Sequence, residues 1–482
     1  MKKIRLLLII PLFCLLLACG TDFTSSPSII APVSDENTEE IEKKKSDERE
    51  EDSFTEEEDN EVLFEEYPPE REWTIMLYMA ADNNLEGDAI TDFNELENAD
   101  FDESVCVLLL FDRAENYDAT NGDWSDTRLY RLCHDDQKNK ALIVSERLDC
   151  PELGISKTSG TELDMANPLT LSSFLEFSRR AYPANNYALM VWGHGTGWRN
   201  ECDADFCEPF SADEGFRAFA LDDASSSYMT ISQLGNAVRE GMGEEALSVI
   251  GFDTCFAVCL ESAFEFSDCA AFMLGTPALV PDSGWNYTAF LNQLMSSEKK
   301  VEDFISAACD NYSELYKNYA YAAFSCIDLS KIPAIVQEFS EYAGQLASKI
   351  TDKTIKDQVF ELFSDKAVSY CSTTYPTDYY VDFSDILSYL DGFHPSGKLK
   401  DLLSTAQVFS WSATGEEASL ALFFCVYRSA GVISGSHPSM YVNGSRETNL
   451  SRFVTECDGY VPTADRRGSL LDKLFYANYQ YE

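Results

Sequence analysis

The strongest constraint on the fold is an alternation of short apolar runs with amphipathic stretches that begins after Pro68-Pro69. Four runs of six or seven residues have the character of strands buried on both faces, at 73–79, 105–111, 187–192 and 247–252. Because predicted strands alternate with predicted helices, the sequence favours an α/β fold with a mainly parallel sheet covered on both faces.

The stretches between these runs carry helical signals. Apolar side chains recur at helical spacing over residues 85–96 and 171–178, and a Thr-x-x-Gln capping box at 230–233 precedes a third such stretch. Beyond about Pro333 the pattern is helical and then mixed, which predicts a C-terminal accessory unit over residues 336–482.

Chemically active side chains follow two of the apolar runs directly, as Gly193-His194-Gly195 and Asp253-Thr254-Cys255. Functional groups of open parallel sheets gather where the strands end. A helix predicted over 256–266 would favour the Cys255 thiolate, as would a nearby imidazolium. Taken alone, a histidine in a turn or a cysteine at a strand end more often has a structural role than a catalytic one. As a pair, His194 and Cys255 are equally consistent with a structural role and with a cysteine nucleophile and its base.

Several segments taken in order identify a family. Residues 73–86, 187–198 and 251–257 resemble the clostripain family of cysteine peptidases, and segments at 280–287, 324–330 and 380–383 agree with it. The resemblance covers about residues 73 to 385. It implies a caspase-like, three-layer α/β/α sandwich, here predicted over residues 71–335, and a Cys-His dyad.

The resemblance also implies roles for individual residues. Cys255 would be the nucleophile and His194 the general acid and base. From these roles we infer that the backbone N–H groups of Gly195 and Cys255 hold the oxyanion. Family members cleave proteins or peptides after basic residues, and the aspartate two before the cysteine, here Asp253, is associated with the specificity pocket. Asp282 is a second candidate for that pocket. A helix cap at Asp253 and a turn at Asp282 are the structural alternatives.

The interval 200–219 is acidic, and in the family it is associated with activation cleavage or calcium binding. Arg199 and Arg217 are the candidate self-cleavage points, although a plain surface loop is the favoured interpretation. Oxygen ligands for calcium are available, but no EF-hand-like spacing is present, so no cofactor is assigned and calcium is left open. The acids concerned are Asp203, Asp205, Asp222 and Asp223.

The N-terminus predicts a lipid anchor. Residues 1–18 read as a signal peptide whose end, Leu16-Leu17-Ala18-Cys19-Gly20, resembles a bacterial lipobox, so Cys19 is expected to be acylated. Residues 19–70 are expected to form a disordered tether, because residues 35–66 hold 17 acidic and 4 basic side chains. These features predict a protein held at the cell envelope, on the outer membrane or cell surface, with the periplasmic face as the alternative.

The charge balance limits the partners. A formal net charge of −47 disfavours nucleic acid and favours cationic chains. Two other functions stay open: a catalytically silent surface lipoprotein that uses the fold for binding, and a peptidase of different specificity. Among the cysteines, Cys202 and Cys207 suggest a local bridge, whereas Cys106, Cys326 and Cys425 are interpreted as buried thiols.

Overall fold

The structure is a computed structural model, and it describes most of the chain beyond residue 70. The described residues are 71–138, 140–197, 219–320, 322–349, 353–362, 366–370, 379–415, 418–424, 426–429 and 432–435. The predicted signal peptide, Cys19 and the tether lie outside them. So do Arg199, Arg217, Asp203 and Asp205, the Cys202–Cys207 pair, and Cys425.

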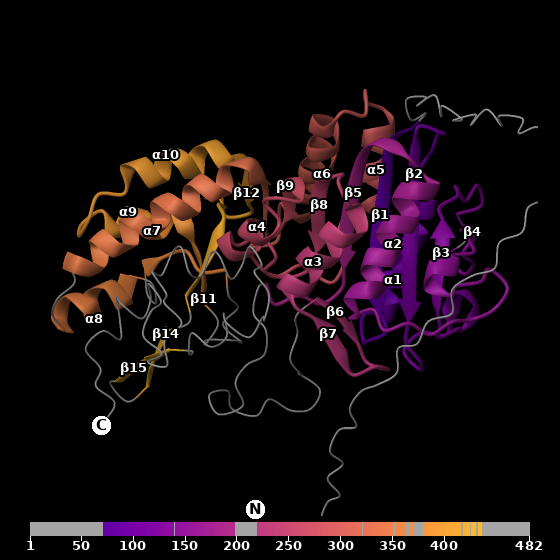
Figure 1. Ribbon diagram of the computed structural model, residues 1–482, viewed down its shortest axis with the longest axis horizontal. Coiled ribbons are helices and arrows are strands. Elements are labelled where there is room, and N and C mark those ends of the chain that lie inside the picture. Colours follow the sequence, from indigo (N-terminus) through magenta and orange to yellow (C-terminus); the bar gives the residue numbers. More distant parts are fainter. Residues whose placement is uncertain are drawn as a thin grey trace, which may run out of the picture. The chain divides into compact units, whose positions relative to one another are not determined.

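The centre of the fold is a nine-stranded sheet with the order β12-β10-β9-β8-β5-β1-β2-β3-β4 (Figure 1). The five strands β2, β1, β5, β8 and β9 run parallel, and antiparallel strands flank them on both sides. The strands of the sheet are β1 Arg71–Ala81, β2 Val105–Arg113, β3 Thr127–Arg131, β4 Glu146–Arg147, β5 Ala184–Trp192, β8 Leu247–Asp253, β9 Ala270–Gly275, β10 Ala323–Asp328 and β12 Gln407–Ser412. The four predicted apolar runs are β1, β2, β5 and β8.

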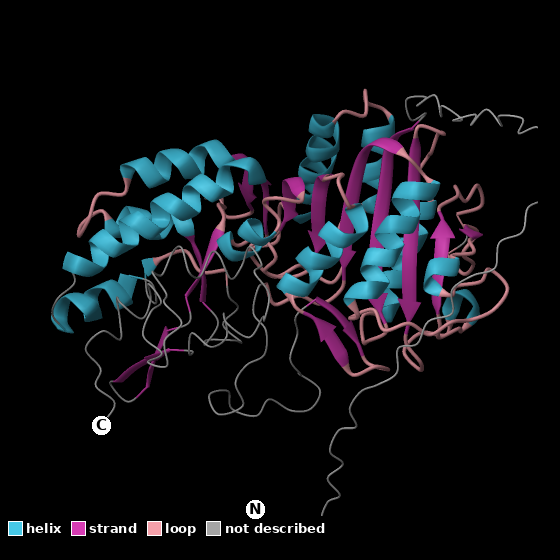
Figure 2. Ribbon diagram, viewed as in Figure 1, coloured by secondary structure: helices cyan, strands magenta, loops and turns pink. Residues whose placement is uncertain are grey.

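Helices cover both faces of the sheet, as Figure 2 shows. Alternate residues of β1 enter two separate cores: Met76 and Tyr78 pack with one set of helices, Ile75 and Leu77 with the other. The first core includes side chains of α2 Pro168–Ala181, α3 Ile231–Met242 and α4 Leu260–Glu265. The second includes those of α1 Glu86–Glu97, α5 Tyr287–Met295 and α6 Val301–Tyr316. The predicted three-layer α/β/α architecture is therefore confirmed.

The local helix signals were read correctly in most places. Residues 85–96 and 171–178 fall on α1 and α2. The capping box before α3 is present: the Thr230 side chain accepts from the Gln233 backbone N–H, and Gln233 accepts from that of Thr230.

The helix predicted over 256–266 is wrong at its start. Only Leu260–Glu265 is helical, and Phe256 has a φ of 57°. The Phe256 N–H donates to Ala278 O and the Val258 N–H to Thr276 O, so this stretch crosses the end of β9 before the helix begins. These hydrogen bonds to a distant segment therefore compete with helix formation at residues 256–259.

The C-terminal stretch contains four helices in its described part, and it returns to the sheet. The helices are α7 Ile332–Lys349, α8 Lys353–Glu361, α9 Phe383–Leu390 and α10 Gly397–Ala406. Strand β12 pairs antiparallel with β10 at the sheet edge, while β11 Tyr379–Asp382 and β13 Ala421–Phe424 form a small separate pair, as do β14 Val426–Ser429 and β15 Val432–Gly435. The division at residue 335 stays a prediction. None of the described helices has the length and apolar character needed to span a membrane.

Candidate active site

His194 and Cys255 come from neighbouring parallel strands in matching register. Strands β5 and β8 pair with Trp192 opposite Asp253, so His194 and Cys255 each lie two residues beyond that pair. The Gly193 N–H donates to Asp253 O over 3.3 Å, which extends the pairing past the strand ends. The sheet therefore brings together the two residues that the sequence predicts as a dyad.

Gly195 lets the two strand ends approach each other closely. A Cβ atom at position 195 would lie 2.7 Å from Cys255 O and 2.7 Å from the Thr254 Cβ, closer than real contacts allow. In the part of the chain that the structure describes, the Gly195 backbone N–H has no hydrogen-bond acceptor. It is therefore available to hold an oxyanion, the role that the sequence analysis gives it.

Asn84 orients the imidazole of His194. The side chain of His194 is buried, and its Nε2 lies 2.8 Å from Oδ1 of Asn84, to which it donates. An amide oxygen only accepts, so the proton is held on Nε2 and Nδ1 is the nitrogen that can take a proton. Sequence reasoning gave Asn84 no role, although it belongs to a polar cluster that follows β1 directly.

The Cys255 thiol receives a backbone donor instead of a helix N-terminus. The Val280 N–H donates to Cys255 Sγ over 3.3 Å. The expected stabilisation by a helix is wrong, because α4 begins only at Leu260. A backbone N–H pointing at sulfur favours the thiolate over the thiol by the same electrostatic reasoning, since it places a positive partial charge beside the anion.

The residue after the nucleophile is held in a left-handed conformation. Phe256 has a φ of 57°, and its ring stacks on Tyr380 at a centroid distance of 5.0 Å. The Tyr380 hydroxyl in turn donates to Thr196 O over 2.6 Å. Strand β11 thus supports both the cysteine turn and the segment that follows His194.

Asp253 is buried at the end of β8, two residues before Cys255. Its Oδ2 accepts from the Trp285 N–H at 3.0 Å and from the Tyr287 hydroxyl at 2.9 Å, while its Oδ1 is buried without a hydrogen-bond partner. Burial raises the pKa of Asp253 to about 7. The helix-cap alternative is wrong, because the N-cap residue of α4 is Cys259. A buried carboxylate oxygen without a donor is a suitable partner for a cation.

A second carboxylate, that of Asp92 on α1, lies close to Asp253. A Cβ atom at Gly284 would be 2.6 Å from Asp253 Oδ2 and 3.1 Å from Asp92 Oδ2, so both carboxylates border the same glycine. The Trp192 Nε1–H donates to Asp92 Oδ2 over 2.7 Å. Burial, and next the charge of Asp253, raise the pKa of Asp92 well above its usual value. No sequence pattern indicates a role for Asp92 beyond its place on an amphipathic helix.

Asp282 is exposed and lies in a turn, in which the Gly284 N–H donates to Pro281 O over 2.9 Å. The turn leads to Gly284, beside Asp253, but the charged neighbour of Asp282 is Asp88, whose pKa is raised by burial and then by the Asp282 charge. The turn interpretation of Asp282 is therefore correct, and its role in the pocket remains a prediction.

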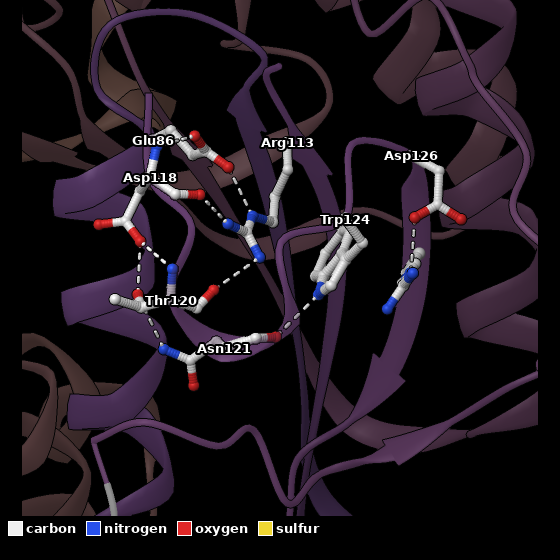
Figure 3. A network of polar contacts seen from close by, with 8 residues as sticks. Glu86, Arg113, Asp118, Thr120, Asn121, Trp124 and Asp126 are labelled. Carbon is white, nitrogen blue, oxygen red and sulfur yellow. Dashed lines mark hydrogen bonds and ion pairs between the residues drawn. The ribbon is translucent and has the colours of Figure 1, made fainter. Parts of the chain in front are cut away.

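A buried ion pair fixes the start of α1, next to Asn84. The Arg113 Nε donates to Glu86 Oε1 over 2.6 Å, and neither side chain is exposed to solvent. Figure 3 shows the same guanidinium donating to the carbonyl oxygens of Asp118 and Thr120, at 2.6 and 3.2 Å, and the Asp118 N–H donating to Glu86 Oε2 at 2.8 Å. The polar atoms of Arg113 and Glu86 that face residues 118–120 therefore have hydrogen-bond partners.

The structure also places the other sequence candidates that it describes. Cys106 and Cys326 are buried thiols, as predicted. Of the two described acids proposed as oxygen ligands, Asp222 is buried and Asp223 is exposed.

Comparison with known proteins gives one consistent result. A sequence model of the clostripain family matches residues 77–447. Clostripain from Hathewaya histolytica is 30% identical over 206 residues, which are 40% of this chain and 35% of that protein. The chain thus aligns with about a third of the length of this curated relative.

Two solved structures share the fold. An inactive zymogen C11 protease from Parabacteroides distasonis is 19% identical with a TM-score of 0.52, and the match covers 74% of this chain and 93% of that one. A secreted C11 cysteine protease from Bacteroides thetaiotaomicron, solved with an irreversible peptide inhibitor, is 16% identical with a TM-score of 0.53, covering 80% and 99%. At these identities the likeness supports the fold, not the details of the site.

Proposed function

The chain belongs to the clostripain family, and from this premise we propose that it is a cysteine endopeptidase in which Cys255 and His194 cleave peptide bonds after Arg or Lys. The observation that carries the proposal is the register of β5 and β8, which sets both residues two positions beyond the Trp192–Asp253 pair. A Cys-His pair at adjacent strand ends is the minimum that thiol proteolysis requires.

In the acylation step, His194 Nδ1 takes the proton of the Cys255 thiol, and the sulfur attacks the scissile carbonyl carbon. In this proposal the backbone N–H of Gly195, a residue close to Cys255 O, donates to the resulting oxyanion. The carbon–nitrogen bond then breaks, the leaving amine takes the proton from His194, and a thioester on Cys255 remains.

In the deacylation step, His194 accepts a proton from water, and the hydroxide attacks the thioester carbon. The carbon–sulfur bond breaks, the new carboxyl group leaves, and the thiolate returns to its hydrogen bond from Val280 N–H. Asn84 holds the imidazole in one orientation through both steps, because its contact is with the nitrogen that does not exchange protons.

The preference for Arg or Lys rests on Asp253. Its Oδ1 is buried without a donor, and a guanidinium or ammonium group is the partner that such an oxygen lacks. The neighbouring carboxyl of Asp92 borders the same glycine, and a bound cation would favour the ionised form of both groups. A neutral side chain would leave the Asp253 oxygen unpaired, so neutral residues before the cut are expected to be poor substrates.

The direct test uses fluorogenic peptides that differ only in the residue before the cut. Protein beginning at Asp35 is incubated with matched Arg, Lys and Ala peptides. Hydrolysis of the first two with little turnover of the Ala peptide supports the proposal. Equal rates on all three would contradict the specificity, and no turnover by protein whose thiol is reduced would favour a binding module instead.

We further propose that acylation of Cys19 anchors the protein to a membrane at the cell envelope. The support is the sequence Leu16-Leu17-Ala18-Cys19-Gly20 at the end of an apolar run of signal-peptide length. The native protein should partition into detergent, and the Cys19→Ala variant should remain in the aqueous phase. Identical partitioning of the two would contradict the anchor.

A further inference from the structure

One side chain from the C-terminal stretch contacts the segments that follow both residues of the proposed dyad. It is Tyr380 of β11, which is fully buried. Its hydroxyl donates to Thr196 O over 2.6 Å, and Thr196 lies two residues beyond His194. Its ring stacks on that of Phe256, the residue after Cys255, with a centroid distance of 5.0 Å and an interplanar angle of 12°. A single tyrosine, 184 residues beyond Thr196 in the sequence, therefore bridges the two turns that carry the dyad.

Phe256 needs support from outside its own turn. Its φ of 57° places it in the left-handed region, which a phenylalanine keeps only where its surroundings hold it there. The Phe256 N–H donates to Ala278 O over 2.8 Å, and its ring lies flat on that of Tyr380. If Phe256 relaxed to a negative φ, the peptide group that joins it to Cys255 would turn, and Cys255 would move relative to His194.

Gly197 makes room for this arrangement on the side of His194. It has a φ of 71°, and a Cβ atom there would lie 2.2 Å from Tyr380 Oη and 2.8 Å from Phe256 O. A side chain at position 197 would therefore push the tyrosine away from both turns. The backbone after His194, the tyrosine and the backbone after the cysteine are thus packed against one another.

The strand beside β11 holds the same stretch through its backbone. Strand β11 pairs with β13, and at the start of β13 the Ala421 N–H donates to Val258 O over 3.1 Å. The Val258 N–H donates to Thr276 O, also over 3.1 Å. Because these bonds do not involve the tyrosine side chain, replacing Tyr380 removes its contacts with the two turns and leaves Val258 in place.

We infer that Tyr380 is a positioning residue for the proposed dyad, and that the stretch beyond residue 335 completes the active site through it. The inference rests on the proposed function, since it gives Tyr380 a role in the reaction of Cys255 and His194. The hydroxyl holds the backbone after the histidine, and the ring holds the turn after the cysteine. Together they keep the thiol and the imidazole in the alignment that proton transfer between them requires.

The hydroxyl and the ring make separate predictions. Tyr380→Phe keeps the ring and loses the bond to Thr196 O, so kcat should fall about 3- to 10-fold. Tyr380→Leu loses both contacts, so kcat should fall about 30- to 100-fold, because a small misplacement of reacting groups is costly. KM should change by less than about twofold in either variant, since the inference gives Tyr380 no contact with substrate.

Alkylation of Cys255 by iodoacetamide gives a readout that does not need peptidase activity. Its rate in the full-length chain at about pH 7.5 is followed by mass spectrometry of the peptide that contains Cys255, because Cys133 is also partly exposed. We expect the rate to fall about tenfold in Tyr380→Leu, since a displaced sulfur loses the imidazole and the Val280 N–H that favour its thiolate. If the parent cleaves no peptide but this difference in alkylation is present, the proposed function fails while the positioning of Cys255 by Tyr380 stands.

Tyr342 offers a matched control in the same C-terminal stretch. This buried residue of α7 also donates to a backbone carbonyl, that of His394, over 3.0 Å, and its ring stacks on the His394 ring at a centroid distance of 5.1 Å. Tyr342→Phe and Tyr342→Leu therefore lose contacts of the same kind. Both should leave kcat and the alkylation rate of Cys255 unchanged.

Three results would overturn the inference. They are equal losses of kcat in Tyr380→Leu and Tyr342→Leu, a rise in KM without a fall in kcat for Tyr380→Leu, and a parental alkylation rate in Tyr380→Leu whose circular dichroism matches that of the parent. If Tyr380→Leu does not fold, Tyr380→Phe decides the matter, and a parental kcat in that variant would overturn the inference.

Discussion

His194 Nε2 donates to Oδ1 of Asn84 over 2.8 Å, and this contact decides which ring nitrogen can serve the cysteine. With Nε2 protonated and engaged, Nδ1 is the nitrogen that exchanges protons. Asn84 contacts neither the sulfur nor the scissile bond in the proposed mechanism, so it is a positioning residue. Its removal should change the rate of chemistry more than substrate binding.

Replacing Asn84 tests this role. For Asn84→Ala we expect kcat to fall about 10- to 100-fold with little change in KM, because the imidazole loses its fixed orientation. Asn84→Asp keeps an acceptor oxygen and should recover most of the rate. Its carboxylate would favour the imidazolium and so move the limb of the pH–rate profile that reports His194 to higher pH.

Asn185→Ala is the matched control, since Asn185 also bonds through its side chain, to Glu72 at 3.0 Å, but lies at the opposite end of β5. It should leave kcat unchanged. A larger effect on KM than on kcat in Asn84→Ala would show that Asn84 contacts substrate instead.

The dyad itself makes a simple prediction. Cys255→Ala and His194→Ala should each lower kcat/KM by at least about a thousandfold, and the double variant should be hardly worse than either one, because the two residues act as a unit. Circular dichroism and Tm should stay near those of the parent. Substantial activity in either single variant would refute the assignment.

Asp253→Asn tests the specificity pocket. The loss in kcat/KM should be at least about a hundredfold for an Arg peptide and much smaller for an Ala peptide, because a charge pair shielded from water depends on both partners. Added salt should hardly change the Arg preference of the parent if the carboxylate is buried, as the 4% exposure of Asp253 requires. Equal losses on both peptides would mean that Asp253 positions Cys255 instead.

The sequence predicted the sheet well because its buried strands follow from local patterns, whereas the dyad remains a prediction. Buried parallel strands are read from apolar runs, and the residues that end such strands meet at one edge of the sheet. Periodicity does not encode the order of β5 and β8, which the structure shows as neighbours in the sheet. The pairing of His194 with Cys255 as a dyad came from the family resemblance.

What the sequence missed depends on contacts between distant segments. The sequence pattern predicts a helix over residues 256–259. In the structure this stretch is not helical, because the Phe256 N–H donates to Ala278 O just beyond the end of β9. Asp92 looks like one acid on an amphipathic helix, and only its bond from Trp192 and the approach of Gly284 reveal its place beside Asp253. A local sequence pattern cannot predict these contacts, because the residues involved are far apart in the sequence.

The buried pair of Arg113 and Glu86 should dominate stability near Asn84. In Arg113→Met the Glu86 carboxylate would be left buried without its counter-charge, which costs about 3–5 kcal/mol. Urea unfolding of the Cys255→Ala background, which avoids self-digestion, measures the change. The double variant Arg113→Met, Glu86→Gln should recover part of the loss. A double variant less stable than Arg113→Met would argue that the hydrogen bonds to Asp118 and Thr120 matter more than the charge.

The pH dependence of specificity gives a separate test of the Asp253 pocket. Burial raises the pKa of Asp253 to about 7, so its carboxyl is neutral below that pH and charged above it. The pairing with a substrate guanidinium is therefore present at alkaline pH and is lost as the pH falls through about 7. Because titration of the dyad affects all peptides alike, the ratio of kcat/KM for Arg and Ala peptides isolates the titration of Asp253.

This ratio of kcat/KM values should rise between about pH 5.5 and 8 in the parent and stay low and flat in Asp253→Asn. A flat but high ratio in the parent would mean that the substrate cation keeps Asp253 ionised throughout, and a rise that persists in Asp253→Asn would assign the titration to another carboxylate, with Asp92 the first candidate.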